Sequence, residues 1–183
     1  MKLLTSSIRW FFPVQTRFKV ISIPLKCRKY YQLNFLQDND LYGHVNNTVY
    51  HSYFDTAINV YLIKHGGMNI SMNETNLLGY YVQTNCFYRA PIEFPNQYLV
   101  GLKIKKMGRS SVTYHASLFP HNNFVIGGKG YNEGEFVTEG QHKSLELSKS
   151  LCDGVYTHVF VDPKTGKPSS LPGDFRSALI KLM

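Results

Sequence analysis

The stretch DNDLYGHVNNTVYHSYFDTAINVYLIKHGG, residues 38–67, decides the fold of this chain. In its second half, apolar and aromatic residues recur three and four positions apart and therefore share one broad helix face. Asn46 or Asn47 can cap the start of this helix, and the glycines of 65–67 can end it in a left-handed turn. The sequence predicts a helix of about five turns, buried through Tyr50, Tyr53, Phe54, Ala57, Ile58, Tyr61 and Leu62.

Extended patterns lie on both sides of this helix. A first strand is expected within 25–36, ahead of the helix. After the helix, alternating or strongly apolar runs predict strands within 77–94, 98–108, 110–120, 122–128 and 154–162. One long helix followed by a run of antiparallel strands is typical of an α+β fold. We therefore expect an antiparallel sheet wrapped around one long central helix.

The domain boundaries follow from composition. With 183 residues, the chain can form one domain with a real core but not two ordinary domains. Residues 1–24 are expected to lie outside the fold, 25–176 to form a single domain, and 177–183 to form a C-terminal tail. The polar segment 129–153 interrupts the strand pattern and is interpreted as an inserted loop. A short terminal helix is expected near the end of the chain.

The formal net charge of +8 belongs to the N-terminal region. Residues 1–37 hold seven of the twenty basic residues and no acid, which leaves thirteen basic and twelve acidic residues in 38–183. A nearly neutral body argues against nucleic-acid binding. A basic, acid-free start is typical of a mitochondrial targeting peptide, so the mitochondrial matrix is the expected location. The alternative is the basic start of a cytoplasmic protein.

The cysteines and the hydropathy pattern exclude further classes. Cys27, Cys86 and Cys152 lie far apart and form no C-x-x-C pair, which indicates a reducing compartment and no disulfide framework. No uncharged apolar run reaches the length of a membrane span. Nothing in the chain predicts a cofactor.

Residues 38–55, which lead into the predicted helix, contain several side chains that can bind metals or take part in catalysis. Asp38, Asp40, His44 and His51 are types that zinc or iron accepts. The two histidines are seven positions apart rather than four, so they do not form a helical H-x-x-x-H pair, and no metal is expected. A carboxylate just before a helix N-terminus can serve catalysis, because the first-turn amides and the macrodipole stabilise negative charge there. Asp40 could also be a turn and capping residue only.

The segment DNDLYGHVNNTVYHSYFDTA, residues 38–57, resembles the signature of hotdog-fold acyl-CoA thioesterases of the 4-hydroxybenzoyl-CoA thioesterase-like superfamily. That signature has an Asp, a Gly or Gln-His pair, Val-Asn-Asn, a Tyr, and Tyr-Phe followed by Asp or Glu. Residues 87–119 and 155–172 resemble the family in the same order. The basic N-terminal extension and the insertion at 129–153 depart from the family's pattern.

The resemblance implies that the chain hydrolyses a thioester. Asp40 takes the position of the family's nucleophile or general base, and Asp38 is the second candidate. His44, Asn46 and Asn47 are implied to orient water, to bind the thioester carbonyl or to hold the loop.

The resemblance also implies a set of substrate-binding residues. The acyl chain is expected among the aromatic residues of the helix, including Tyr50. Gly79 takes a position where a partner subunit's backbone amide points at the thioester oxygen, although a strand bulge is an alternative explanation for this glycine. Suitable side chains for the phosphates of coenzyme A, if they are not simply solvated, are Arg89, Arg109, Ser110 and Ser111.

The expected function is therefore that of an acyl-CoA thioesterase that works as a homodimer or homotetramer. The acyl chain and the choice between coenzyme A and acyl-carrier protein stay open. The alternative is a non-catalytic hotdog module that binds acyl groups or acts as an interaction subunit in a mitochondrial assembly.

Overall fold

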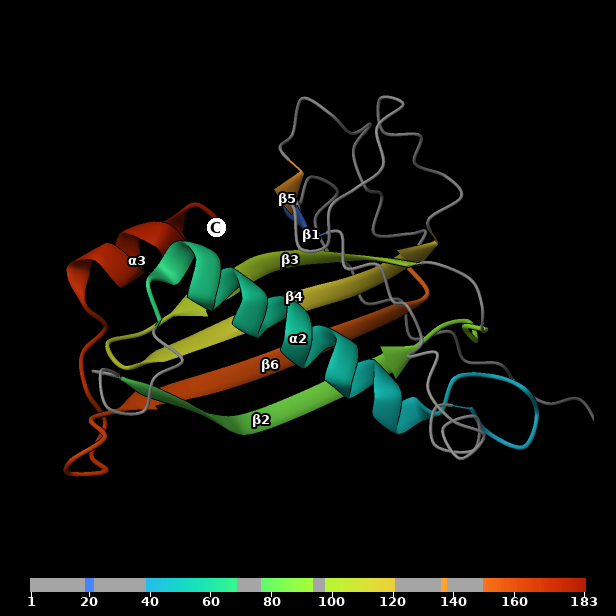
Figure 1. Cartoon of the computed structure of the whole chain (residues 1–183), viewed down its shortest axis with the longest axis horizontal. Coiled ribbons are helices and arrows are strands. Elements are labelled where there is room, and N and C mark those ends of the chain that lie inside the picture. The colour runs from blue at the N-terminus through green and yellow to red at the C-terminus, as the bar shows by residue number, and fades with distance from the viewer. Residues whose placement is uncertain (1–18, 22–38, 69–76, 94–97, 121–135, 138–149) are drawn as a thin grey trace, which may run out of the picture.

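The computed structural model describes residues 19–21, 39–68, 77–93, 98–120, 136–137 and 150–183. In this part of the chain, an antiparallel sheet packs against one long helix, α2 (Asn47–Gly66), and a short helix, α3 (Gly173–Ile180). The strand order is β2-β6-β4-β3-β1-β5. Figure 1 shows α2 lying across one face of the sheet. The strands are β1 (Lys19–Ile21), β2 (Leu78–Tyr88), β3 (Tyr98–Met107), β4 (Ser111–Pro120), β5 (Phe136–Val137) and β6 (Cys152–Val161).

This architecture confirms the predicted α+β hotdog fold. The sheet curves around a single long helix, and β3, β4 and β6 are each ten residues long. A further prediction placed strands within 25–36 and 122–128, which lie outside the described residues. No helix in the described ranges is long and apolar enough to cross a membrane.

Helix α2 begins and ends with the predicted caps. The Asn46 side chain accepts a hydrogen bond from the Thr48 amide at 3.0 Å, which satisfies one of the unpaired first-turn donors. Gly67 follows the helix with φ 69°, the left-handed conformation that glycine adopts at low cost. Between the caps, the buried face is Tyr50, Phe54, Ala57, Ile58, Tyr61 and Leu62.

The helix-facing side of the sheet supplies the other half of the core. Alternate residues of β3, β4 and β6 are buried there because successive strand side chains point to opposite faces. They include Leu102 and Ile104 on β3, Tyr114 and Leu118 on β4, and Tyr156 and Phe160 on β6.

Gly154 on β6 lets α2 approach the sheet closely. A Cβ atom at this position would lie 2.4 Å from the Tyr156 ring and 2.9 Å from the Phe54 ring. Both rings are buried, so neither has free space into which to withdraw. The absence of a side chain at Gly154 is therefore a condition for the close packing of Phe54 on β6.

The chain end is part of the domain, so its prediction as a tail at 177–183 was wrong. Ala178, Leu179 and Leu182 are buried, and the Leu182 carbonyl accepts a hydrogen bond from the Ile104 amide at 2.9 Å. The Tyr61 hydroxyl donates to the Ala178 carbonyl at 2.8 Å, which joins α3 to α2. The α3 pattern is too short for its burial to be evident from periodicity alone.

Two other predicted boundaries also need correction. Lys19–Ile21, within the segment excluded from the fold, pairs with β3 as strand β1. The inserted loop was predicted to run to residue 153, yet β6 begins at Cys152, and Phe136–Val137 forms strand β5. Both boundaries were predicted from the residue composition of the segments. Strand pairing instead depends on partners that are distant in the sequence, which composition does not reveal.

We expect Gly154→Ala to destabilise the fold by about 1–3 kcal/mol, the usual cost of overpacking a filled core. The added methyl group has to displace the Tyr156 or Phe54 ring. Gly173→Ala is the matched control, because nothing lies within 4 Å of its added Cβ atom. Urea unfolding of both variants measures the difference, and equal loss of stability in the two would contradict this packing.

His158 on β6 predicts a second property of the fold. Its imidazole is buried beside the Tyr81 ring, and burial lowers its pKa from 6.5 to about 4. Between pH 6.5 and pH 4, His158 is therefore protonated in the unfolded chain but mostly neutral in the folded protein. The contribution of His158 to the free energy of unfolding is fully present above pH 6.5. It decreases by about 3 kcal/mol as the pH falls toward 4. Unfolding curves at pH 7 and pH 4 test this, and His158→Phe should reduce the difference between them.

Candidate active site

The loop before α2 is organised by Asp40. Its carboxylate oxygen Oδ1 accepts hydrogen bonds from the backbone amides of Tyr42 at 2.8 Å and His44 at 2.9 Å. The Asp40 amide donates in turn to the His44 carbonyl at 2.6 Å. Gly43 makes the turn possible with φ 82°. These bonds fix one carboxylate oxygen and leave Oδ2 without a hydrogen bond from the described residues, with the side chain 35% exposed.

His44 lies between two carboxylates. Its Nδ1 atom is 3.9 Å from Asp40 Oδ2, and its Nε2 atom is 3.9 Å from Glu93 Oε1. Both distances exceed that of a hydrogen bond, so the ring can still turn toward a third group. A β-bridge between His44 and Glu93, with a bond from the Val45 amide to the Ile92 carbonyl at 2.8 Å, holds the loop against the segment after β2.

Asn46 has a structural role through its side chain, and Asn47 has one through its backbone carbonyl. Asn46 Oδ1 accepts from both the amide and the hydroxyl of Thr48. The Asn47 carbonyl accepts from the Tyr88 hydroxyl at 3.1 Å, which joins the first turn of α2 to the end of β2. The side-chain amide of exposed Asn47 has no bond within the described residues and faces solvent.

Tyr50 belongs to the core. It is 2% exposed, its hydroxyl accepts from the Ile92 amide at 3.1 Å, and its ring meets the Tyr88 ring edge-on. Burial raises the pKa of Tyr50 to about 12. Its hydroxyl therefore stays neutral and positions the loop from inside the protein.

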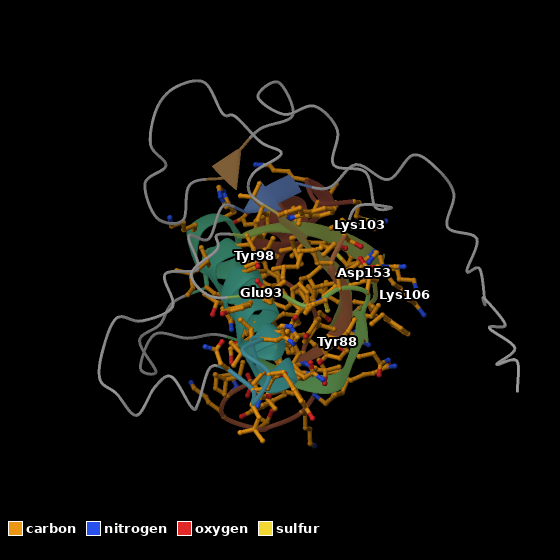
Figure 2. The ribbon with its side chains drawn as sticks, turned by 90° about the vertical axis from the view of Figure 1, so that its right-hand side faces the viewer. Tyr88, Glu93, Tyr98, Lys103, Lys106 and Asp153 are labelled. Atoms are coloured by element: carbon orange, nitrogen blue, oxygen red, sulfur yellow. The ribbon has the colours of Figure 1, made fainter. Side chains whose placement is uncertain are left out.

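Arg89 is paired within the domain. Its Nε and Nη2 atoms both donate to Asp153 Oδ2, at 2.7 and 2.5 Å. Burial disfavours the Asp153 carboxylate, but hydrogen bonds from His115, Ser117 and Arg89 outweigh this and hold its pKa below the usual range. Figure 2 labels Asp153 with Lys103 and Lys106 on the side of the sheet away from α2. Arg89 therefore donates two of its five guanidinium N–H groups to an internal carboxylate.

Of the predicted substrate-binding residues, Gly79, Arg109, Ser110 and Ser111 lie at the other end of the sheet from Arg89, which follows the end of β2. Gly79 pairs with Phe160, and the Phe160 amide donates to the Ser110 carbonyl at 2.8 Å. Arg109 and Ser111 flank this point in the β3–β4 hairpin, and Arg109 Nε donates to the Ser170 hydroxyl at 3.0 Å. The irregularity in β2 falls between Tyr81 and Gln83, so Gly79 itself is not the bulge.

One chain therefore separates the predicted site residues into two groups. Asp40, His44 and the N-terminus of α2 lie near Tyr88, at the end of β2, whereas Gly79 lies at its beginning. The nine steps of strand between Gly79 and Tyr88 span about 30 Å. The two groups cannot act on the same thioester within a single subunit.

Several neighbours of the loop had no signal in the sequence. Glu93 reaches the loop through a β-bridge to His44, and Tyr88 reaches the adjoining helix start through a bond to Asn47, between segments about forty to fifty residues apart. A separate contact joins His51 with Cys86 and Tyr156, one helical turn inside α2. Asp38 lies outside the described residues, and within these no three His, Cys, Asp or Glu side chains are grouped for a metal ion.

Comparison with known proteins gives a family match. A model of the thioesterase superfamily matches residues 42–123, which begin two residues after Asp40. The PA5185 protein of Pseudomonas aeruginosa is 31% identical, with 92% of each chain covered and a TM-score of 0.65. No curated protein matches the chain.

Two further solved structures share the fold at lower identity. A Thermus thermophilus thioesterase in complex with coenzyme A and zinc is 20% identical, with 90% of this chain and 98% of that chain covered and a TM-score of 0.57. The 1,4-dihydroxy-2-naphthoyl-CoA thioesterase Slr0204 of Synechocystis is 14% identical, with coverage of 91% and 98% and a TM-score of 0.59.

We expect Asp40→Ala and Asp40→Asn to differ in their effect on the loop. Asparagine keeps an acceptor for the Tyr42 and His44 amides, whereas alanine removes it. Amide hydrogen exchange at these two positions should become about tenfold faster in Asp40→Ala and stay near the wild-type rate in Asp40→Asn. The Thr48 amide, held by Asn46, is the internal control. Equal exchange in both variants would show that the carboxylate does not organise the loop.

Proposed function

Because the chain belongs to the thioesterase superfamily of hotdog-fold proteins, we propose that it hydrolyses an acyl-CoA thioester to a free acid and coenzyme A. The observation that carries the proposal is the Asp40 carboxylate. One of its oxygens is fixed by two backbone amides, and the other is unbonded among the described residues at a partly exposed position. A carboxylate held in one orientation with one free oxygen is suited to attack, or to remove a proton, from a defined direction.

Two forms of the reaction are compatible with this geometry. As a nucleophile, Asp40 Oδ2 bonds to the thioester carbon and displaces the coenzyme A thiolate, and water then hydrolyses the resulting anhydride. As a general base, the same oxygen takes a proton from a water molecule that attacks the carbonyl carbon directly. His44, 3.9 Å from Asp40, is placed to hold the water or the carbonyl in either form.

The developing oxyanion needs hydrogen-bond donors that are already oriented. The N-terminus of α2 offers unpaired amides and the positive end of the helix macrodipole, and it has no acidic residue in its first turn. Gly79 would add a backbone amide from a second subunit.

A two-fold dimer would bring the two separated groups together. Strand β2 is at the edge of the sheet and carries exposed apolar residues, including Val82 at 62% and Tyr80 at 57% exposure. A long edge strand of this kind is rarely left unpaired in a soluble protein. Antiparallel pairing of two β2 strands about Gln83 would place Gly79 of one subunit beside Phe87 of the other. Each site would then use Asp40 from one subunit and the Gly79 end of its partner.

The same pairing assigns the coenzyme A end of the substrate to the partner's hairpin. Exposed Arg109, with the hydroxyls of Ser110 and Ser111, would meet the phosphates there. Arg89 contributes less to this role because its guanidinium is already bonded to Asp153. Location in the mitochondrial matrix stays a prediction from the N-terminal charge pattern, and any cleaved peptide would have to end before Lys19, where β1 begins.

We expect Asp40→Asn to lower kcat on the best substrate of an acyl-CoA panel by at least about 100-fold. This is the lower end of what a general base usually contributes to the rate. The variant retains the loop bonds, so the loss reports on the carboxylate rather than on folding. Asp174→Asn, an exposed carboxylate on α3, is the matched control and should keep wild-type activity. Wild-type kcat in Asp40→Asn would exclude the assigned role.

A single turnover in ¹⁸O water separates the two forms of the reaction. Label in the Asp40 carboxylate identifies a nucleophile whose anhydride water has opened at the aspartyl carbon, whereas a general base places label in the acid product alone. Absence of turnover on every thioester, together with stable binding of acyl-CoA, would favour the alternative function as a non-catalytic acyl-binding module.

A further inference from the structure

A cluster of titratable side chains lies beneath the N-terminal half of α2, apart from Asp40. The Cys86 thiol of β2 is 3.1 Å from the Tyr156 hydroxyl of β6 and 3.7 Å from Nδ1 of His51 on α2. The Tyr156 hydroxyl is itself 2.8 Å from the same His51 nitrogen. Cys86 and His51 are partly exposed, so small molecules in solution can reach this side of the cluster.

A second thiol lies on the neighbouring strand. Cys86 pairs with Gly154, and Tyr88 pairs with Cys152, so the two cysteines are diagonal neighbours on adjacent antiparallel strands. Both point to the helix-facing side of the sheet, where Cys152 is fully buried. Gly154, opposite Cys86, has no side chain to separate the two sulfur atoms.

The surroundings divide the roles of the two thiols. The groups that face Cys86 are His51 from α2, Tyr88 from its own strand, and Cys152 and Tyr156 from β6. A hydrogen bond from Cys152 lowers the pKa of Cys86, and burial raises it. Further lowering by the Tyr156 hydroxyl and the charge of His51 brings the pKa to about 6. The same hydrogen bond and burial raise the pKa of Cys152. These surroundings favour ionisation of Cys86 before Cys152.

We propose that Cys86 and Cys152 form a redox-active dithiol site, in which Cys86 reacts first with a peroxide and Cys152 then closes a disulfide. The geometry supports this order, because Cys86 is partly exposed and contacts hydrogen-bonding groups of His51 and Tyr156, whereas Cys152 is fully buried. The site is independent of the thioester chemistry proposed for Asp40.

The chemistry balances with a peroxide as the only oxidant. The Cys86 thiolate attacks one peroxide oxygen and becomes a sulfenic acid, while the other oxygen leaves as hydroxide or alkoxide. The Cys152 sulfur then attacks the Cys86 sulfur, and the sulfenic oxygen leaves as water after taking the Cys152 proton. Two thiols lose two electrons in total, and the peroxide gains them.

The strand geometry predicts a bond that is easily reduced. Diagonal neighbours in an antiparallel pair have Cα atoms about 7–8 Å apart. Unstrained disulfides span about 4.4–6.8 Å, so closure has to draw β2 and β6 slightly together. Strain of this kind favours the reduced form, which suits a reversible site rather than a structural crosslink.

The first test is the mass of the intact full-length protein after treatment with hydrogen peroxide. All variants carry Cys27→Ser, so that only Cys86 and Cys152 can form an internal bond. The parent should lose the mass of two hydrogens and regain it with dithiothreitol. Cys152→Ser should stop at a sulfenic acid on Cys86, trapped by dimedone, and Cys86→Ser should remain unchanged. Two free thiols in the peroxide-treated parent would overturn the proposal.

The second test is the pH dependence of Cys86 alkylation by iodoacetamide, followed by peptide mapping. The greater thiolate fraction at pH 7 is largely offset by lower intrinsic nucleophilicity, leaving an advantage of only about fivefold over an ordinary thiol. The midpoint is therefore more informative than the rate, and it should lie near pH 6. A midpoint near 9 would show that Cys86 is an ordinary thiol and would overturn its assigned role.

Tyr156→Phe keeps both thiols and most of the packing, so it serves even if a cysteine variant fails to fold. It removes the hydroxyl that contacts Cys86 and His51. The alkylation midpoint should rise and disulfide formation should slow, whereas a purely structural role for this hydroxyl would change neither.

Discussion

The close contact between α2 and β6 is the constraint on which the rest of the structure depends. Phe54 packs over Gly154, where a side chain would not fit, and Ile58 and Leu62 continue the same fully buried face. Each of these side chains contributes about 1.5–3 kcal/mol through burial. Because α2 is rigid, this contact also determines where its first turn lies. That turn meets Tyr88 at the end of β2 and positions the Asp40 loop against Ile92.

The position of α2 has a consequence for the assembly. It places the Asp40 loop at one end of β2 and leaves Gly79 and the β3–β4 hairpin at the other, about 30 Å away. A small substrate cannot contact both ends in one subunit, but an adenosine nucleotide joined to a pantetheine arm is itself long. An antiparallel dimer through β2 would pair the exposed edge strand. The same contact would bring the Asp40 loop of one subunit and the Gly79 end of its partner within reach of one long substrate. The proposed composite site is thus a consequence of strand length as much as of the catalytic residues.

The polar groups beneath α2 are unusual for a core. His51, Tyr156 and Cys86 form a contact that is more polar than helix-to-sheet packing requires, and His158 is held neutral nearby. A buried polar network of this kind lowers the stability of the fold unless each polar group has a hydrogen-bond partner. The proposed dithiol gives Cys86 and Cys152 a chemical role that packing alone does not explain.

Much of the fold could be predicted from the sequence, and the site only in part. The caps and length of α2 follow from Asn46 and Gly67 and from the spacing of its apolar residues, because helix periodicity is local. Asp40 was identifiable from its position before the helix and from the resemblance of residues 38–57. Arg89 was predicted from its residue type, but its pairing with Asp153 depends on the register between β2 and β6.

By itself, the sequence determined the central helix and the α+β class, since both rest on patterns among residues close together in the chain, and its resemblance to the thioesterase family made Asp40 the candidate carboxylate. Only the tertiary structure decided that Lys19–Ile21 and α3 belong to the domain and that Cys86 meets His51 and Cys152. It also decided that the site residues separate into two groups. These outcomes depend on strand register, which joins residues as distant as Cys86 and Gly154, and no local pattern encodes such a pairing.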